Sequence, residues 1–163
     1  MANKTIITAK PGIQEVRIER EFDAPCELVF SAYTDPELYV QWLDPRGYTM
    51  TLETFAPRPG GAYRYIQKDA AGQKFAFHGV YHEVRAPERI INTFEFEGLP
   101  EAGYVALETV RFERLPDNRT RVKAQSVFQT ITDRDGMVAT GMVTGQGDGH
   151  ARLDEVLKRV QQN

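Results

Sequence analysis

The sequence contains one cysteine, one tryptophan and no large excess of either charge. Because Cys26 stands alone, no disulfide can form within the chain, so a hydrophobic core has to hold the fold together. The 20 basic and 23 acidic side chains leave a net charge of −3, which provides no strong uniform field for nucleic-acid phosphates. No apolar run approaches the roughly 18 residues of a membrane span. These absences argue against a nucleic-acid partner and against membrane insertion.

The chain does contain enough apolar material for one core. Of its residues, 41% are apolar or aromatic, and a chain of this length buries roughly 68–70% of its unfolded surface. No repeat, low-complexity tract or linker divides it, so we expect one domain over residues 13–163 after a tail at 1–12. Because Met1 to Lys10 lacks the apolar stretch and cleavage site of a secretion signal, we expect a cytoplasmic location.

Periodicity predicts a strand followed by two short helices. Apolar and polar residues alternate from Val16 to Phe22, which is typical of a half-buried strand and predicts one over 13–22. Two proline-containing signals follow, Asp23-Ala24-Pro25 and Asp35-Pro36, and each suits the first turn of a helix. The second helix is expected to end at about Leu43.

The central part of the chain alternates short aromatic and β-branched segments with turn residues, the pattern of an antiparallel meander. Six strands are expected there, over Tyr48–Phe55, Ala62–Gln67, Lys74–Val84, Arg89–Phe96, Tyr104–Arg114 and Thr120–Phe128. After them, Leu153, Val156, Leu157 and Val160 recur at helical spacing and predict a terminal helix over 147–161. Residues 133–144 are expected to form a helical turn or two and then a break.

This order of elements predicts an α+β fold. A curved seven-stranded antiparallel sheet would wrap around the long C-terminal helix, because both have one apolar face to bury. A single helix fills the concave side of such a sheet incompletely. The space left between them is the natural site for a ligand.

Several short segments have the order and spacing of a known family. They include Phe22-Asp23-Ala24-Pro25, Thr34-Asp35-Pro36-Glu37, Trp42, Gly60-Gly61, His78-Gly79-Val80, Pro87-Glu88-Arg89-Ile90, Arg134-Asp135-Gly136-Met137 and Arg152-Leu153. Together they resemble the homologues of the heat-shock-protein-90 ATPase activator C-terminal domain, in the START-like, Bet v 1-like (SRPBCC) superfamily of helix-grip folds. The resemblance covers nearly the whole chain. Leu43 and Phe30 depart from it, since many relatives carry tryptophan there.

The resemblance implies three hypotheses about function. Members of the superfamily bind lipids, hormones and polyketides, which suggests a small hydrophobic or amphipathic ligand in the cavity. Some act as aromatase/cyclases, which suggests a cyclase- or hydrolase-type enzyme with a cavity His or Glu as acid or base. The eukaryotic namesake stimulates a chaperone's ATPase, so a chaperone-interacting module is the third. Because the namesake uses a further N-terminal domain, for which we expect no room here, the chaperone role is a poor inference. Homodimer formation stays open.

Candidate ligand-binding residues come from aromatic and polar side chains at strand and helix positions. They are Arg20, Trp42, Phe55, Tyr63, Tyr65, His78, Phe94, Phe96, Met137 and Met142. Arg20 interrupts an apolar strand face, so it either holds an anionic head group or forms a salt bridge at the end of the strand. Glu108 interrupts the face of Ala106 and Val110 in the same way. The nearly neutral charge favours an uncharged or weakly anionic guest.

Candidate acid–base residues are His78, His82 and Glu83. Strand alternation places the two histidines on one face and Phe75, Phe77, Gly79, Tyr81 and Glu83 on the other. Both faces carry apolar residues, so periodicity does not decide which points inward, and a structural role for each histidine is the alternative. Four residues of strand separate the histidines by roughly 13 Å, which predicts that they share no metal ion. No metal and no cofactor are expected.

Gly141, Gly145 and Gly149 recur every four residues, and Gly147 lies between them. A phosphate-binding loop would need a preceding parallel strand, which the pattern lacks. In a helix the three glycines would share a face with Met137. Such a face indicates close helix–sheet contact, a kink, or space over a cavity.

Overall fold

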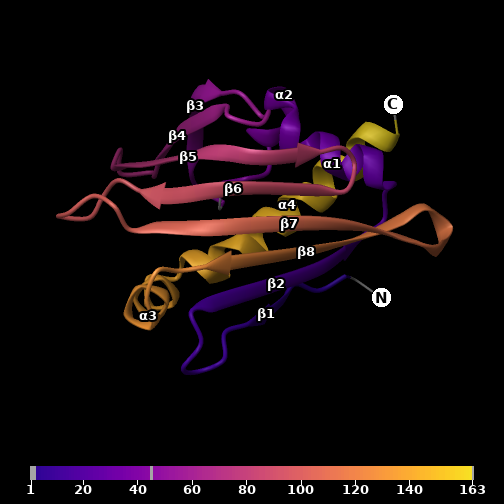
Figure 1. The fold of residues 1–163 in the computed structure, drawn as a ribbon. Coiled ribbons are helices and arrows are strands. Elements are labelled where there is room, and N and C mark those ends of the chain that lie inside the picture. Colours follow the sequence, from indigo (N-terminus) through magenta and orange to yellow (C-terminus); the bar gives the residue numbers. More distant parts are fainter. Residues whose placement is uncertain (1–2, 45, 163) are drawn as a thin grey trace.

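The computed structural model describes residues 3–44 and 46–162, and within them the chain forms an α+β fold with eight strands in one antiparallel sheet. The long C-terminal helix lies across one face of this sheet, as expected (Figure 1). The strand order is β1-β2-β8-β7-β6-β5-β4-β3. The elements are β1 (Ile6–Thr8), β2 (Glu15–Phe22), α1 (Cys26–Thr34), α2 (Pro36–Tyr39), β3 (Thr49–Phe55), β4 (Ala62–Lys68), β5 (Lys74–Arg85), β6 (Arg89–Phe96), β7 (Val105–Leu115), β8 (Arg119–Val127), α3 (Ile131–Ala139) and α4 (Met142–Gln161).

The N-terminal segment corrects the expected number of strands. Residues 1–12 were predicted to be a tail, but Ile6–Thr8 pairs with β2, Ile6 lying opposite Glu19. This strand is short and exposed along its length, so it has no alternation from which periodicity could detect it. Its neighbour Thr5 reaches α4, where its hydroxyl is 3.2 Å from Nδ1 of His150.

The helices differ more from expectation than the strands, whose ends agree within two residues. The second helix ends at Tyr39 rather than near Leu43, and α4 begins at Met142, five residues before the predicted start. Gly141, with φ +83°, makes the left-handed turn that separates α3 from α4. The glycines that follow are accommodated inside the helix. At Gly149 a Cβ would lie only 3.3 Å from the Trp42 carbonyl oxygen, so α4 passes very close to the segment after α2.

A β-bulge in β5 decides which side chains point inward. The register between β5 and β6 shifts between Tyr81 and Glu83, so the alternation breaks at this point. Phe77 and Tyr81 are buried on the inner face. Glu83, predicted to share that face, lies instead opposite Ile91, with its carboxylate 2.5 Å from Nε of Arg89.

The core consists of two groups of buried residues within the described chain. The larger joins α1 and α4 to the sheet and includes Phe22, Val29 and Leu153, none of which is exposed. The smaller lies around Val16, Ala106, Phe128 and Val143. Residues of both groups line one cavity, which therefore occupies the space between them. Among residues 3–44 and 46–162, no helix has the length and apolar character needed to cross a membrane.

Candidate functional site

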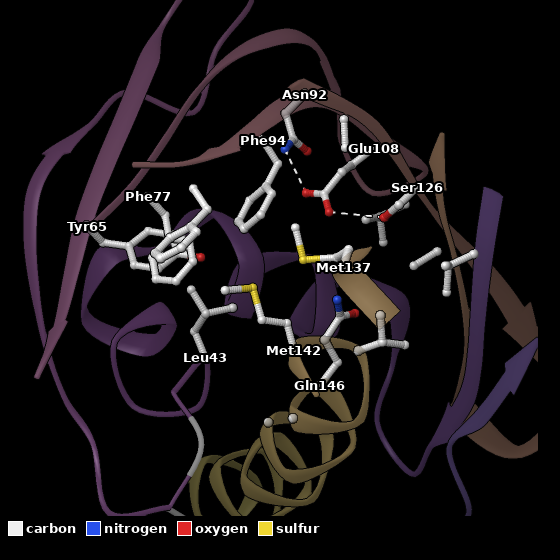
Figure 2. A pocket seen from close by; sticks show the side chains of 18 of the residues that line it. Leu43, Tyr65, Phe77, Asn92, Phe94, Glu108, Ser126, Met137, Met142 and Gln146 are labelled. Carbon is white, nitrogen blue, oxygen red and sulfur yellow. Dashed lines mark hydrogen bonds between the residues drawn. The ribbon is translucent and has the colours of Figure 1, made fainter. Parts of the chain in front are cut away.

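A cavity of about 560 Å³ lies between the inner face of the sheet and the helices α3 and α4 (Figure 2). Aromatic rings from β4, β5 and β6 form one wall, and Met137 and Met142 lie opposite them. Small-molecule sites in proteins typically measure about 300–1,000 Å³. The cavity is therefore large enough for a small organic ligand.

Seven of the predicted ligand-binding residues line this cavity. They are Trp42, Tyr63, Tyr65, Phe94, Phe96, Met137 and Met142. The positions of Tyr63, Tyr65, Phe94 and Phe96 follow from strand alternation, because inward side chains on adjacent antiparallel strands lie side by side. Trp42 reaches the cavity from the segment after α2, and Met137 and Met142 reach it from α3 and α4. Contact of each with a ligand stays a prediction.

Arg20 and Phe55 do not line the cavity, contrary to expectation. The Arg20 side chain is 6% exposed and its Nη2 lies 2.6 Å from Oδ2 of Asp154, so the salt bridge considered as its alternative is formed. Its guanidinium also lies 5.1 Å from the Phe22 ring centroid. Phe55 stacks on Tyr39 with ring centroids 5.1 Å apart, in a layer behind the lining.

The three candidate acid–base residues also lie outside the cavity. His78 is on the outer face of the sheet, where its Nδ1 is 2.8 Å from Oε2 of Glu97 and its side chain is 42% exposed. His82 is exposed, and Glu83 pairs with Arg89. The inward face of β5 is that of Phe77 and Tyr81, so none of these three can reach a molecule inside the protein.

The polar centre of the cavity is Glu108, the residue that interrupts the apolar face of β7. Asn92 on β6 and Ser126 on β8 stand directly opposite it in the sheet register. Asn92 Nδ2 donates to Oε1 of Glu108 over 3.2 Å, and Ser126 Oγ donates to Oε2 over 3.1 Å. Figure 2 shows the carboxylate between these two donors and pointing toward Met137.

A tyrosine extends this cluster along the sheet. Asn92 Nδ2 lies 3.3 Å from the Tyr63 hydroxyl, which donates to the Thr93 carbonyl oxygen over 2.5 Å. The Tyr63 ring lies against Gly79, where a Cβ would be only 2.7 Å from a ring carbon. Gly79 thus leaves room for Tyr63 to reach the cluster.

Burial governs the charges of the groups that line the cavity. It raises the pKa of Glu108, while the hydrogen bonds from Asn92 and Ser126 act in the opposite direction. Burial also raises the pKa values of Tyr63 and Tyr65 above the ordinary range. It lowers the pKa of His150 to about 4, so that this imidazole is neutral at pH 7. Within the described chain the lining contains no lysine and no arginine.

Asn92, His150 and Ser126 belong to the residues of the site that were not predicted, although each left a signal in the sequence. Asn92 occupies an inward position in the alternation of Ile90, Phe94 and Phe96. His150 lies three residues before Leu153, on the apolar face of α4. Ser126 left the least evidence, because only the pairing of β7 with β8 places it beside Glu108.

The described residues contain no group of three or more His, Cys, Asp or Glu side chains placed to hold a metal ion. An antiparallel sheet around a C-terminal helix, with a cavity between them, defines the helix-grip class of proteins. The family of activator of Hsp90 ATPase homolog 1-like proteins matches residues 23–158, and the chain belongs to this family. None of the curated proteins compared with the chain matches it.

Solved structures share this architecture. A Rhodobacter sphaeroides protein is 25% identical, with a TM-score of 0.85 over 96% of this chain and 99% of its own. A protein from Arthrobacter aurescens is also 25% identical, with a TM-score of 0.86 over 94% of this chain and 91% of its own. The protein described as AHSA1 from Silicibacter pomeroyi is 16% identical, with a TM-score of 0.74 over 91% and 99% of the two chains. This last similarity concerns the fold alone.

Proposed function

We propose that the protein binds a small, flat and largely apolar molecule in the cavity between the sheet and α4. The observation that carries this proposal is the cavity itself, about 560 Å³ in volume and lined mainly by aromatic and apolar side chains around one polar cluster. A cavity of this kind is the usual form of a small-molecule site. The polar cluster supplies the few directed hydrogen bonds that orient a ligand.

The arrangement of the rings supports a flat ligand. The Tyr65 and Phe77 rings are nearly parallel, with centroids 5.1 Å apart and an interplanar angle of 25°. Phe77 and Phe94 continue the row at 5.4 Å and 28°. Offset stacking favours parallel rings at these distances, so a flat aromatic guest can continue this row.

Thermal unfolding in the presence of a metabolite extract tests this function, followed by mass spectrometry of what remains bound. A ligand at 100 times its Kd stabilises the folded state by about 2.7 kcal/mol. For a chain of this size that shift in stability raises the Tm by roughly 5–10 °C. No shift with any fraction, and no molecule recovered from untreated protein, would contradict the proposal.

Two variants of α4 give a matched control. Gly145 lines the cavity, so Gly145→Leu places a side chain in the ligand volume and abolishes the thermal shift. Gly147 is not part of the lining, and a Cβ there meets nothing within 4 Å. Gly147→Leu changes helix propensity by the same amount and keeps the shift.

Acid–base catalysis is the second candidate function, and the position of Glu108 favours it. A carboxyl group whose pKa is raised by an apolar environment is suited to exchange protons near neutral pH. Glu108, which faces the cavity, thus takes the role first considered for His78, His82 and Glu83. Recovery of a chemically changed ligand, lost in Glu108→Gln with binding retained, distinguishes catalysis from binding alone. Contact with a chaperone stays a prediction on which the cavity has no bearing.

A further inference from the structure

We infer that the cavity selects aromatic molecules that carry a protonated nitrogen, and that Glu108 sets this specificity. The inference rests on the proposed ligand-binding function and names the chemical class of the ligand. It reverses the expectation of an uncharged or weakly anionic guest. Three features of the described chain carry it: the unused hydrogen-bond acceptor positions of the Glu108 carboxylate, the lack of a partner cation in the described lining, and the aromatic wall.

The Glu108 carboxylate has unused hydrogen-bonding capacity toward the cavity. A carboxylate offers about four lone-pair positions on its two oxygens. Asn92 occupies one position on Oε1 and Ser126 one on Oε2, and both donors come from the sheet. The Glu108 side chain keeps part of its surface accessible although protein surrounds it, because it borders the cavity. A donor on a ligand can therefore reach both oxygens.

The described cavity lining supplies no positive charge to balance Glu108. Neither lysine nor arginine belongs to it, and no cation acts on the carboxyl. Arg20, the other charged residue that interrupts an apolar strand face, is bound to Asp154 instead. A buried carboxylate without a partner is unfavourable, so the empty site favours the protonated acid. A ligand cation supplies the missing charge, whereas an anion finds no cation in the described lining and is repelled whenever Glu108 is ionised.

The aromatic wall beside Glu108 favours the same kind of ligand. The faces of aromatic rings carry negative potential and attract cations within about 6 Å of the ring centroid. Figure 2 shows Phe94 and Phe77 on the same side of the cavity as the carboxylate. The polarisable sulfur atoms of Met137 and Met142 lie across from them. An aromatic ammonium ion can stack on the rings while its N–H groups donate to Glu108.

This recognition makes binding depend on pH through Glu108. Among the residues that the structure describes, the cavity lining contains these other titratable side chains: Tyr33, Tyr39, Tyr48, Tyr63, Tyr65 and Tyr81, from α1, α2, the following loop, β4 and β5, and His150 from α4. The pKa of His150 is lowered to about 4, so this imidazole is neutral from pH 6 to pH 7.5, while burial raises the pKa of Glu108. Asp44 follows the lining residue Leu43, and burial raises its pKa to about 6. Binding of a cation then releases a proton from Glu108.

Three probes with one ring system test the inference: 2-naphthylmethylamine, 2-naphthalenemethanol and 2-naphthoate. Calorimetry at pH 7.5 measures the Kd of each. We expect wild type to bind the amine at least ten times more tightly than the naphthoate, with the alcohol between them. At pH 6, titrations in two buffers of different ionisation enthalpy should detect proton release with the amine only. Equal or tighter binding of naphthoate would overturn the inference.

Variants separate Glu108 from the remaining charges. Glu108→Gln should reduce the ratio of amine to naphthoate affinity at least tenfold and change alcohol affinity by less than about threefold. Glu113 lies on the same strand, 41% exposed and paired with Arg121. As a control, Glu113→Gln removes the same charge and should leave the ratio of amine to naphthoate affinity unchanged. Ser126→Ala keeps the carboxyl but removes a donor, so the pH midpoint of amine binding rises. An unchanged ratio in Glu108→Gln would refute the inference.

Failure of the underlying function gives a different result. The neutral alcohol reports on the cavity and not on Glu108. If none of the three probes binds to wild type, the proposed function and this inference both fall. If the alcohol binds but the amine has no advantage over naphthoate, only the inference falls.

Discussion

His150 lies on the inner side of α4, where its Nδ1 is 3.2 Å from the Thr5 hydroxyl and its ring meets Phe22 edge to face. Burial lowers its pKa from 6.5 to about 4. Between pH 6.5 and pH 4, His150 is therefore protonated in the unfolded chain and neutral in the folded protein. The contribution of His150 to the free energy of unfolding is fully present above pH 6.5 and is lost as the pH falls from 6.5 to 4.

We expect the free energy of unfolding to decrease by about 3 kcal/mol between pH 7 and pH 4 through this one residue. His150→Gln removes the group that titrates, so the free energy of unfolding of this variant, measured by urea denaturation, should depend less on pH between pH 7 and pH 4. Chemical denaturation at four or five pH values measures the difference. A variant with the same slope as wild type would show that other groups cause the acid sensitivity.

Asp44 produces the opposite dependence. It is 2% exposed, its Oδ1 has no hydrogen-bond partner within the described residues, and burial raises its pKa from 3.8 to about 6. A raised pKa means that the folded protein holds the proton more tightly than the unfolded chain, so stability falls as the pH rises from 4 to 6. Asp44→Asn should raise the free energy of unfolding at pH 7.5 by up to about 3 kcal/mol.

The pH profile provides the control for this prediction. At pH 3 the wild-type carboxyl is largely protonated in both states, so most of the advantage of Asp44→Asn should disappear. Asp35→Asn is not a suitable comparison, because Asp35 caps α2 by accepting from the Glu37 amide. Asp69 closes a turn in the same manner. Asp148→Asn, at an exposed position of α4, should leave the unfolding energy unchanged at both pH values.

At the scale of single elements, α4 combines two kinds of glycine. At Gly149 a Cβ would lie 3.3 Å and 3.4 Å from the carbonyl oxygens of Trp42 and Leu43, while at Gly147 it would meet nothing within 4 Å. The first glycine allows the helix to approach the backbone, and the second has no such role. The spacing of the glycines predicts a close contact without telling which glycine makes it.

The two positions should therefore respond in opposite ways to the same substitution. Gly149→Leu should lower the free energy of unfolding by about 2 kcal/mol, because the backbone of residues 42 and 43 has to move. Gly147→Leu should raise it by about 0.5–1 kcal/mol through helix propensity. Equilibrium denaturation measures both. Equal effects of the two substitutions would refute the close contact.

The elements also explain why the candidate acid–base residues lie outside the cavity. Alternation along β5 correctly separates His78 from Phe77, but both faces contain apolar residues and the inward one is not evident. The bulge after Tyr81 then reverses the alternation, which places Glu83 outside. An extra residue in one strand is a property of the pairing between strands, so the pattern of β5 alone does not reveal it.

At the scale of the whole molecule, the sheet and α4 leave a cavity instead of closing on each other. Side chains that border this cavity should contribute less to stability than those in the filled core. Leu153 is fully buried on α4, whereas Met142 on the same helix is half-buried at the cavity. Removing atoms beside an existing cavity forfeits fewer packing contacts.

Leu153→Ala should accordingly lower the free energy of unfolding by about 3 kcal/mol, and Met142→Ala by about 1 kcal/mol or less. Both changes remove a long apolar side chain from one helix, so differences in helix propensity are small. A bound ligand should enlarge the effect of Met142→Ala and leave that of Leu153→Ala unchanged. Equal losses in the free protein would indicate that the cavity is closed by packing.

The sequence by itself determined the order of the elements from β2 onward and the class of fold, because periodicity and turn residues are local properties that survive without tertiary contacts. It also marked Glu108 as an anomaly, since a charge at a core-facing strand position needs an explanation wherever it occurs. Trp42, Tyr63, Tyr65, Met137 and Met142 were predicted for the site as aromatic and apolar side chains. These inferences depend only on neighbours along the chain.

Only the tertiary structure decided which faces point inward and which side chains meet. The union of Asn92, Glu108 and Ser126 depends on the register of three strands, and the pairing of Arg20 with Asp154 joins residues 134 positions apart. Pairing of the short strand β1 depends on the free edge of β2 and not on any pattern of its own. Register and long-range pairing are set by packing over the whole molecule, so a local reading of the chain leaves them undetermined.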